Sequence, residues 1–169
     1  MKDNGQADKA EKKKCEHLLA FLRDLNRCRD LDSLAQAILE HAIALVPQAQ
    51  SGSFLVLNEE EGVFEYRAAV GWDLARLSRI KIPKDCIVQR KLGHRGPIIV
   101  RDAQRFNHEF LPPEIARELD EFPVAAFVSF PVEYEGEVIA YFNLDNLDNP
   151  DAFSEEDLCL LYTSDAADE

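Results

Sequence analysis

Residues 126–157 read AFVSFPVEYEGEVIAYFNLDNLDNPDAFSEED, and this stretch decides the fold class of the chain. Two apolar runs of strand length, Val124–Val132 and Val138–Leu144, flank a polar turn, Tyr134–Glu137, that contains a glycine. Because the runs are short and a tight turn joins them, we predict that they pair as an antiparallel hairpin.

A helix start follows the hairpin after a short acidic loop. We predict that Ser154 caps the amide of Asp157 and that the carboxylate of Asp157 reaches back. Phe153 is expected to pack on Leu158 across the first turn. The predicted domain therefore closes with a hairpin, an acidic loop and a capped helix.

Two helical segments precede the first predicted strand. Asp8–Arg29 carries apolar residues on one face and charged residues on the other, which predicts an amphipathic leader helix within residues 1–30. A second helix begins at Asp30 or Asp32 and stops at Pro47. The leader's apolar stripe is explained equally by core packing and by the seam of a parallel homodimer. Three leucines of this stripe are Leu18, Leu22 and Leu25.

The middle of the chain reads as short strands with helical turns between them. In the second strand, we predict that Phe64, Tyr66, Ala68 and Val70 share one apolar face. Strands and helices do not alternate regularly, so the chain is predicted to be α+β with an antiparallel sheet. The predicted order is strands Ser53–Leu57, Val63–Val70 and Leu77–Ile82, a helical turn Asp85–Lys91, a strand Pro97–Val100, a loop Phe106–Pro113 and a helix Pro113–Leu119.

Length, charge and cysteine spacing limit the class of protein. The 169 residues suit one domain with a short extension, and the net charge of −13 disfavours nucleic acid and anionic membrane as partners. No apolar run has the length of a membrane helix and no secretion signal is visible, so we expect a cytoplasmic protein. The four cysteines show no metal-binding spacing and are expected to be reduced thiols.

The order and local strings of Leu31–Leu158 resemble a GAF domain. The matching strings are LVPQAQSGSFLVL (45–57), AAVGW (68–72), GPIIVRDAQRF (96–106), VSFPVEYEGEVIAYFNLDN (128–146) and AFSEEDL (152–158). The resemblance implies a six-stranded antiparallel sheet with the helices that enter and leave the domain on one face. It implies a ligand pocket on the other face, roofed by Asp73–Pro123. It also implies a regulatory, small-ligand-binding module covalently linked to an output domain such as a histidine kinase or diguanylate cyclase.

The candidate pocket residues are apolar and aromatic side chains with a few polar anchors, as in most small-molecule sites. Ser129 and Asn143 are the most informative, because each places a polar group in an apolar strand and needs a partner there. Asp102 follows a strand end and also suits a turn or a helix cap. Ile80 and Phe106 lie on segments that could reach the same pocket. The predicted ligand-binding residues are Tyr66, Trp72, Cys86, Asp102, Phe127, Ser129, Tyr141 and Asn143.

Known ligands of the family fit this sequence poorly, so the cofactor stays open. The cyclic-nucleotide pattern of the family is broken at Leu147 and Leu158. Bilin attachment requires a cysteine beside a histidine, which Cys86 lacks, and His94 and His108 are isolated loop histidines rather than evident haem ligands. No residue is assigned to a metal.

Two alternatives to a sensor stay open. A free methionine sulfoxide reductase, a known GAF-fold enzyme, would use the thiolate of Cys86, but Cys15 and Cys28 fall on the leader helix and offer no evident resolving thiol. The absence of catalytic pairs favours a protein that is not an enzyme. A ligand-free GAF domain that only dimerises is the second alternative.

The last eleven residues, Cys159–Glu169, read CLLYTSDAADE and resemble the translation of an adapter used to prepare sequencing libraries. We expect this segment to be an artefact and expect any output domain of the intact protein to be missing from the chain. Reading the gene from intact genomic DNA tests this expectation.

Overall fold

The computed structural model describes residues 9, 12–13, 16 and 30–162 of the chain. The first fully described helix, α2, spans Leu31–Leu45. Asp30 is its N-cap, because its carboxylate accepts a hydrogen bond from the Ser33 amide at 2.8 Å, and Val46 ends the helix before Pro47. The leader-helix prediction and the leucines Leu18, Leu22 and Leu25 lie outside the described residues.

A single antiparallel sheet with the strand order β3-β2-β1-β6-β5-β4 forms the centre of the domain. Its middle pair joins the two halves of the chain, since Ser51–Val56 of β1 pairs with Ala140–Asp145 of β6. The predicted six-stranded α+β sheet is therefore confirmed. The strands are β1 Ser51–Asn58, β2 Val63–Val70, β3 Lys81–Pro83, β4 Ile98–Val100, β5 Ala126–Tyr134 and β6 Glu137–Asn146.

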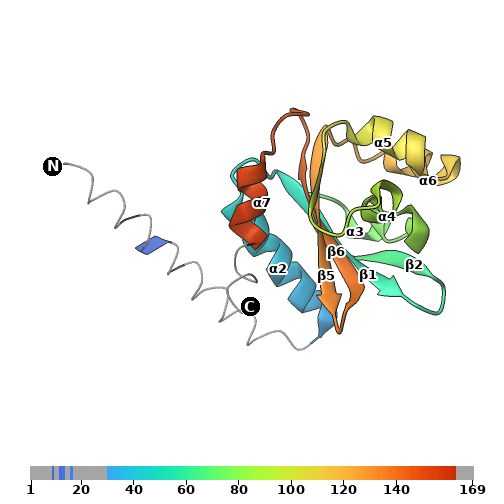
Figure 1. Cartoon of the computed structure of the whole chain (residues 1–169), viewed down its shortest axis with the longest axis horizontal. Helices are drawn as coiled ribbons and strands as arrows, with labels where there is room; N and C mark the ends of the chain where they lie inside the picture. The colour runs from blue at the N-terminus through green and yellow to red at the C-terminus, as the bar shows by residue number, and fades with distance from the viewer. Residues whose placement is uncertain (1–8, 10–11, 14–15, 17–29, 163–169) are drawn as a thin grey trace.

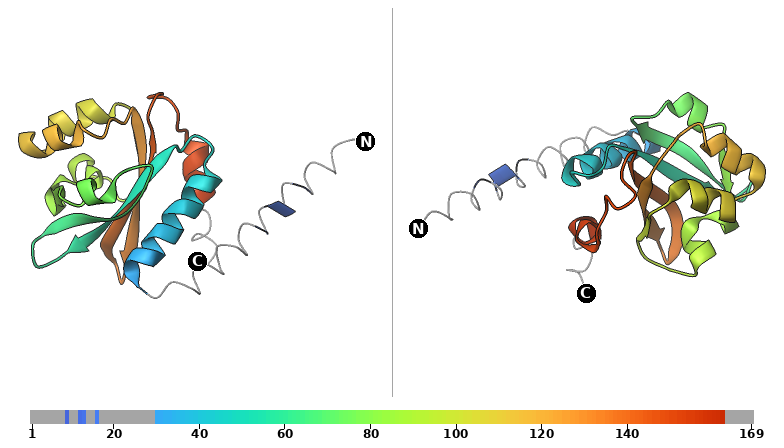
Figure 2. Two further views of the ribbon diagram at one scale, coloured as in Figure 1. Left: turned by 180° about the vertical axis from the view of Figure 1, so that it is seen from behind. Right: turned by 90° about the horizontal axis from the view of Figure 1, so that it is seen from above.

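Helices α2 and α7 (Glu155–Tyr162) lie together on one face of the sheet (Figures 1 and 2). Leu39 of α2, Leu144 of β6 and Phe153 before α7 are at most 1% exposed in this core. The Asp157 carboxylate reaches back to the Ser154 amide at 2.8 Å, as predicted. The Asp157 amide, however, donates to the backbone oxygen of Ser154, so the predicted side-chain cap of that amide is wrong. Residues 163–169 of the predicted artefact tail lie outside the described part of the chain.

The opposite face is roofed by short helices that Figure 1 shows on the far side of the sheet from α2 and α7. Residues 103–110 form α5 where a loop was predicted from Phe106. The helix is easily missed because its sequence, AQRFNHEF, is largely polar, and it begins where the Asp102 carboxylate accepts from the Arg105 amide at 3.1 Å. The roof consists of α3 Leu74–Leu77, η1 Lys84–Cys86, α4 Val88–Leu92, α5 Ala103–Phe110 and α6 Pro113–Leu119.

The predicted third strand is shorter than expected. Leu77 ends α3 instead of starting a strand, because the Asp73 carboxylate accepts from the amides of Ala75 and Arg76 and holds a helical turn. Only Lys81–Pro83 pairs with β2. None of the helices in the described ranges is long and apolar enough to cross a membrane.

A β-bulge divides the apolar residues of β2 between the two faces of the sheet. The register shifts so that Phe54 pairs with Ala68 while Leu55 pairs with Tyr66, which leaves Arg67 as an extra residue. The prediction of one common face is therefore wrong. Ala68 packs under α2, whereas Tyr66 packs under the roof. The bulge thus turns the ring of Tyr66 toward the roof.

Candidate functional site

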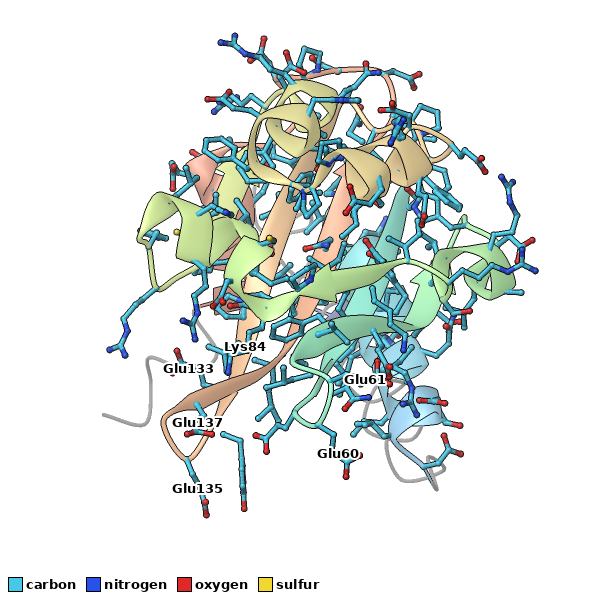
Figure 3. All side chains as sticks on the ribbon, turned by 90° about the vertical axis from the view of Figure 1, so that its right-hand side faces the viewer. Glu60, Glu61, Lys84, Glu133, Glu135 and Glu137 are labelled. Carbon is cyan, nitrogen blue, oxygen red and sulfur yellow. The ribbon has the colours of Figure 1, made fainter. Side chains whose placement is uncertain are left out.

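A cavity of about 280 Å³ lies between the sheet and the roof helices. Its floor comes from β1, β2, β5 and β6, and its cover comes from the segment between Trp72 and Val124. Figure 3 looks onto this roof side, with α5 and α6 above the sheet and the tips of the two long hairpins at the lower end. The cavity therefore occupies the face that the sequence predicted for a ligand.

Two rows of cross-strand partners form the cavity floor. Ser53, Asn143 and Ser129 pair across β1, β6 and β5, and all three line the cavity. The next row contains Asp145 of β6 and its β5 partner Phe127. Because alternate residues of a strand face the same side, Asn143 and Asp145 point to the same cavity. The antiparallel register brings together residues that lie far apart in the sequence.

Asp145 is the most buried charged side chain at the cavity, with 6% of its surface exposed. Its Oδ2 atom accepts hydrogen bonds from the indole Nε1 of Trp72 at 3.0 Å and from the hydroxyl of Ser51 at 3.3 Å. Burial raises the pKa of Asp145 to about 6, although the hydrogen bonds from Trp72 and Ser51 oppose the shift. The pKa of nearby Tyr66 is also raised, first by burial and then by the charge of Asp145. Asp145 is therefore ionised at neutral pH but easily protonated below it.

Gly71 places Trp72 beside this carboxylate. Its φ angle is +79°, a conformation that side chains with a Cβ disfavour, and a Cβ added there would lie 2.8 Å from the Cβ of Ser51. The chain can therefore turn directly after β2 and bring the indole back over the sheet only with glycine at this position.

The two polar strand residues singled out in the sequence have different surroundings. Ser129 is 2% exposed, and the buried Gln89 side chain of α4 donates to both its hydroxyl and its backbone oxygen at 3.2 Å. Ser129 therefore ties the sheet to the roof. Asn143, in contrast, has an enclosed Oδ1 atom without a hydrogen-bond partner among the described residues. Gln89 Oε1 is likewise unpaired in the described part of the chain.

The structure brings most of the predicted ligand-binding residues together. Asp102 does not line the cavity, since its carboxylate caps α5, and Ile80 belongs to the surrounding core. Phe106 does line the cavity. The predicted residues at the cavity are Tyr66, Trp72, Cys86, Phe127, Ser129, Tyr141 and Asn143.

Sequence reasoning missed Asp145, because the predicted strand stopped at Leu144 and left Asp145 in the acidic loop. The available signal was the alternation of Asn143 and Asp145, which places two polar groups on one face of a slightly longer strand. The other polar lining residues that were missed are Ser53, Gln104, Asn107 and Asp120.

The charge at the cavity is of one sign. Asp145 and Asp120 are the charged side chains among its described lining residues, and neither lysine nor arginine contributes. Asp120 lies at the roof, where His108 Nε2 contacts its Oδ2 atom at 2.8 Å. Nowhere within the described ranges do three His, Cys, Asp or Glu side chains gather in a way that could hold a metal ion.

A second, more charged groove lies beside α4 and the tip of the β5–β6 hairpin. Its lining includes Lys84, Arg90 and Arg95 on one side and Glu133 and Glu137 on the other. Figure 3 shows Glu133, Glu135 and Glu137 along this hairpin and Glu60 and Glu61 at the other hairpin tip. Tyr141 lines both the groove and the cavity, so the two are neighbours.

A protein-family model described as the GAF domain matches residues 28–163 of the chain. The comparison with curated proteins found no match. The GAF domain of an Acinetobacter phosphoenolpyruvate-protein phosphotransferase has 17% sequence identity and a TM-score of 0.68, and the match covers 89% of this chain and 87% of that one.

Two further solved structures share the fold. A domain of a two-component sensor histidine kinase protein from Sinorhizobium meliloti has 19% identity and a TM-score of 0.61, with 80% of this chain and 86% of that chain covered. A type II free methionine-R-sulfoxide reductase from Thermoplasma acidophilum has 21% identity and a TM-score of 0.56, with 79% and 84% covered. At these identities the similarity defines the fold, and the site must be interpreted from its own residues.

Proposed function

The chain belongs to the GAF domain family, and we propose that it is a sensor domain that binds a small organic molecule in the cavity above β1 and β6. In the intact protein, a covalently linked output domain would respond to occupancy of this cavity. We expect that protein to work in the cytoplasm.

The cavity of about 280 Å³ with Asp145 at its floor carries this proposal. Its size lies near the lower end of the volumes usual for ligand sites, about 300–1,000 Å³. A domain that served only as a dimerising spacer would gain stability by filling this volume with side chains, because each unfilled cavity weakens the core. A buried carboxylate and an unpaired amide oxygen are likewise costly without a ligand to meet them.

The position of Asp145 connects the cavity to both helices on the other face. The backbone oxygen of Asp145 accepts from the amide of Gln50, in the segment between α2 and β1, at 2.8 Å. Leu147, at the start of the loop that leads to α7, donates its amide to Gln50 Oε1 at 2.7 Å. A ligand that moves Asp145 would therefore act on the segments that join α2 and α7 to the sheet, and those helices are the domain's connections to the rest of the chain.

A thermal-shift and fluorescence screen tests the sensor proposal. The protein contains one tryptophan, Trp72, and it lines the cavity, so its emission reports occupancy directly. A bound metabolite should raise the melting temperature by mass action and change the Trp72 emission. As a matched pair of variants, Asn143→Leu should abolish both effects, whereas Asn149→Leu on the exposed loop should not. If a broad set of amino acids, amines, nucleotides and organic acids has no effect, the dimerising-spacer alternative replaces the proposal.

The reductase alternative rests on Cys86, which lines the cavity, and on the Thermoplasma structure with the same fold. Reduction of a sulfoxide by a thiol releases the thioether and leaves a sulfenic acid on the cysteine, and a second thiol is then needed to convert the sulfenic acid to a disulfide with loss of water. Cys159, the other cysteine in the described residues, lies on α7 across the sheet. Turnover of free methionine sulfoxide that is lost in Cys86→Ser would overturn the proposal of sensing without catalysis.

We also propose that the leader helix forms a parallel homodimer through Leu18, Leu22 and Leu25. The support is the apolar stripe in the sequence. Light scattering on the chain with and without residues 1–29 tests it, and a monomer in both cases excludes the seam.

A further inference from the structure

We propose that the cavity selects an organic cation, a primary ammonium on a small apolar body, and that Asp145 is the residue that pairs with the charge. This inference rests on the proposed sensor function and adds the chemical class of the ligand.

The first argument is the sign of the charge at the cavity. Its described lining residues include the carboxylates Asp120 and Asp145 and no lysine, arginine or histidine. Arg76 lies beside the lining residue Phe122, but its side chain is half-exposed and does not line the cavity. Its Cζ atom is 5.3 Å from the centroid of the Phe122 ring, and its guanidinium pairs with Glu121. A phosphate or carboxylate ligand would therefore enter a partly apolar space without a cation to balance it, which is strongly unfavourable.

The second argument is the unused hydrogen-bonding capacity of Asp145. Both of its side-chain hydrogen bonds, from Trp72 and Ser51, end on Oδ2. In the described structure no protein donor reaches Oδ1, and an ionised carboxylate accepts hydrogen bonds on both oxygens. A ligand N–H placed beside Asp145 would supply the missing donor, and a charged donor makes the stronger bond.

The third argument is the aromatic surroundings of this carboxylate. Tyr66, Trp72, Phe122 and Phe127 all line the cavity, and the Trp72 and Phe122 rings meet edge to face with centroids 5.7 Å apart. The faces of aromatic rings attract organic cations, and the attraction is strongest for tryptophan. A carboxylate among aromatic rings therefore favours an ammonium over a neutral ligand of the same size.

The protonation behaviour of the site agrees with this charge preference. The titratable groups around Asp145 at the cavity are Tyr66, Tyr141, Cys86 and Asp120 with its partner His108. The pKa of Tyr66 is raised, so its hydroxyl stays neutral near pH 7. With a neutral phenol beside it, Asp145 remains the buried negative charge that a cation would stabilise.

Three probes of nearly equal shape and different charge test the inference: phenylpropylammonium, phenylpropanamide and phenylpropanoate. Binding is measured from the Trp72 emission at pH 7.5, with excitation that the phenyl groups do not absorb. We expect the ammonium to bind at least about tenfold more tightly than the amide and the carboxylate to bind most weakly. In Asp145→Asn the ammonium should lose about tenfold in affinity or more, while the amide should change less than about twofold. Asp151→Asn, which removes an exposed carboxylate outside the cavity, should leave all three affinities unchanged.

The outcomes separate this inference from the sensor proposal. If the amide or the carboxylate binds as tightly as the ammonium, the cavity is a ligand site but the charge preference is wrong. If the ammonium binds equally well to the wild type and to Asp145→Asn, Asp145 is not its partner and the inference fails. If none of the probes binds, the inference fails, and the wider metabolite screen alone decides whether the domain is a sensor. A urea unfolding curve of Asp145→Asn shows whether that variant is folded.

Discussion

The indole Nε1 of Trp72 donates a hydrogen bond to Oδ2 of Asp145 at 3.0 Å, across 73 residues of sequence. The contact joins the turn after β2 to the end of β6, and both side chains line the cavity. It also shows how the domain tolerates a buried carboxylate. Hydrogen bonds from Trp72 and Ser51 stabilise the charge at Oδ2, and Oδ1 remains available to a ligand in the cavity.

Removal of this buried charge should stabilise the unliganded domain at neutral pH. Burial raises the pKa of Asp145 to about 6, above the ordinary 3.8, so the folded state holds the proton more tightly than the unfolded chain does. The contribution of Asp145 to stability is therefore most favourable at acid pH and declines as the pH rises from about 4 to 6, with little further change above that range. Asp145→Asn should be more stable than the wild type at pH 7 by up to about 3 kcal/mol.

Urea unfolding of both proteins between pH 4 and pH 7 measures this effect. Subtracting one free energy of unfolding from the other cancels the contributions of the other carboxylates, which are the same in both proteins. The remaining difference should grow with pH. A difference that stays constant over the range would contradict the assignment of the raised pKa to Asp145.

The same titration should control binding of the ammonium probe. A cation favours ionised Asp145, so its affinity should be constant above pH 6 and fall below it by about tenfold per pH unit at the steepest. An anionic ligand would show the reverse, with affinity rising as Asp145 takes up its proton. Fluorescence titrations of the wild type and Asp145→Asn at several pH values measure this effect. The affinity of the variant for the ammonium probe should not depend on pH in this range.

Gly71→Ala should be much more destabilising than the same change at Gly62. Both residues have positive φ, +79° and +67°, so each substitution carries the backbone cost of about 1 kcal/mol. At Gly62 a Cβ meets nothing within 4 Å, whereas at Gly71 it meets the Cβ of Ser51 at 2.8 Å. The clash should add roughly 1–3 kcal/mol and change the Trp72 emission. Equal losses in chemical denaturation would show that the close approach at Gly71 is unimportant.

The hydrogen bonds between Gln89 and Ser129 should appear as a coupling in a double-mutant cycle. Both side chains are buried. The loss of unfolding free energy in the double variant, Gln89→Ala with Ser129→Ala, should therefore differ from the sum of the losses in the two single variants by about 1 kcal/mol. The exposed pair Gln36 and Glu40, 2.9 Å apart on α2, is the control and should couple by less than about 0.5 kcal/mol. A Gln89–Ser129 coupling near zero would mean that the roof is not tied to the sheet at this point.

Much of the fold could be predicted from local patterns. The β5–β6 hairpin, the β1–β2 hairpin, α6 and the Asp30 cap all arise from interactions within a few residues: strand-length apolar runs, a glycine turn, Pro113 at a helix start and a side chain that meets a nearby amide. Such interactions can be predicted from the sequence because their partners are only a few residues apart along the chain. The resemblance to the GAF family then predicted that six strands share one antiparallel sheet, whereas the order of the strands, β3-β2-β1-β6-β5-β4, came from the structure.

The sequence by itself thus determined the fold class and the hairpin strands that pair as neighbours, and the family resemblance indicated the face on which a ligand pocket was expected. Tertiary structure alone decided the site. The bulge at Arg67 turned Tyr66 away from Ala68, the positive φ of Gly71 brought Trp72 back over the sheet, and the register of β1 with β6 set Ser51 beside Asp145. The physical reason is the range of the interactions. Hydrogen bonds and burial at Asp145 depend on partners many residues away, and a shift of one residue in strand register would turn its carboxylate to the opposite face.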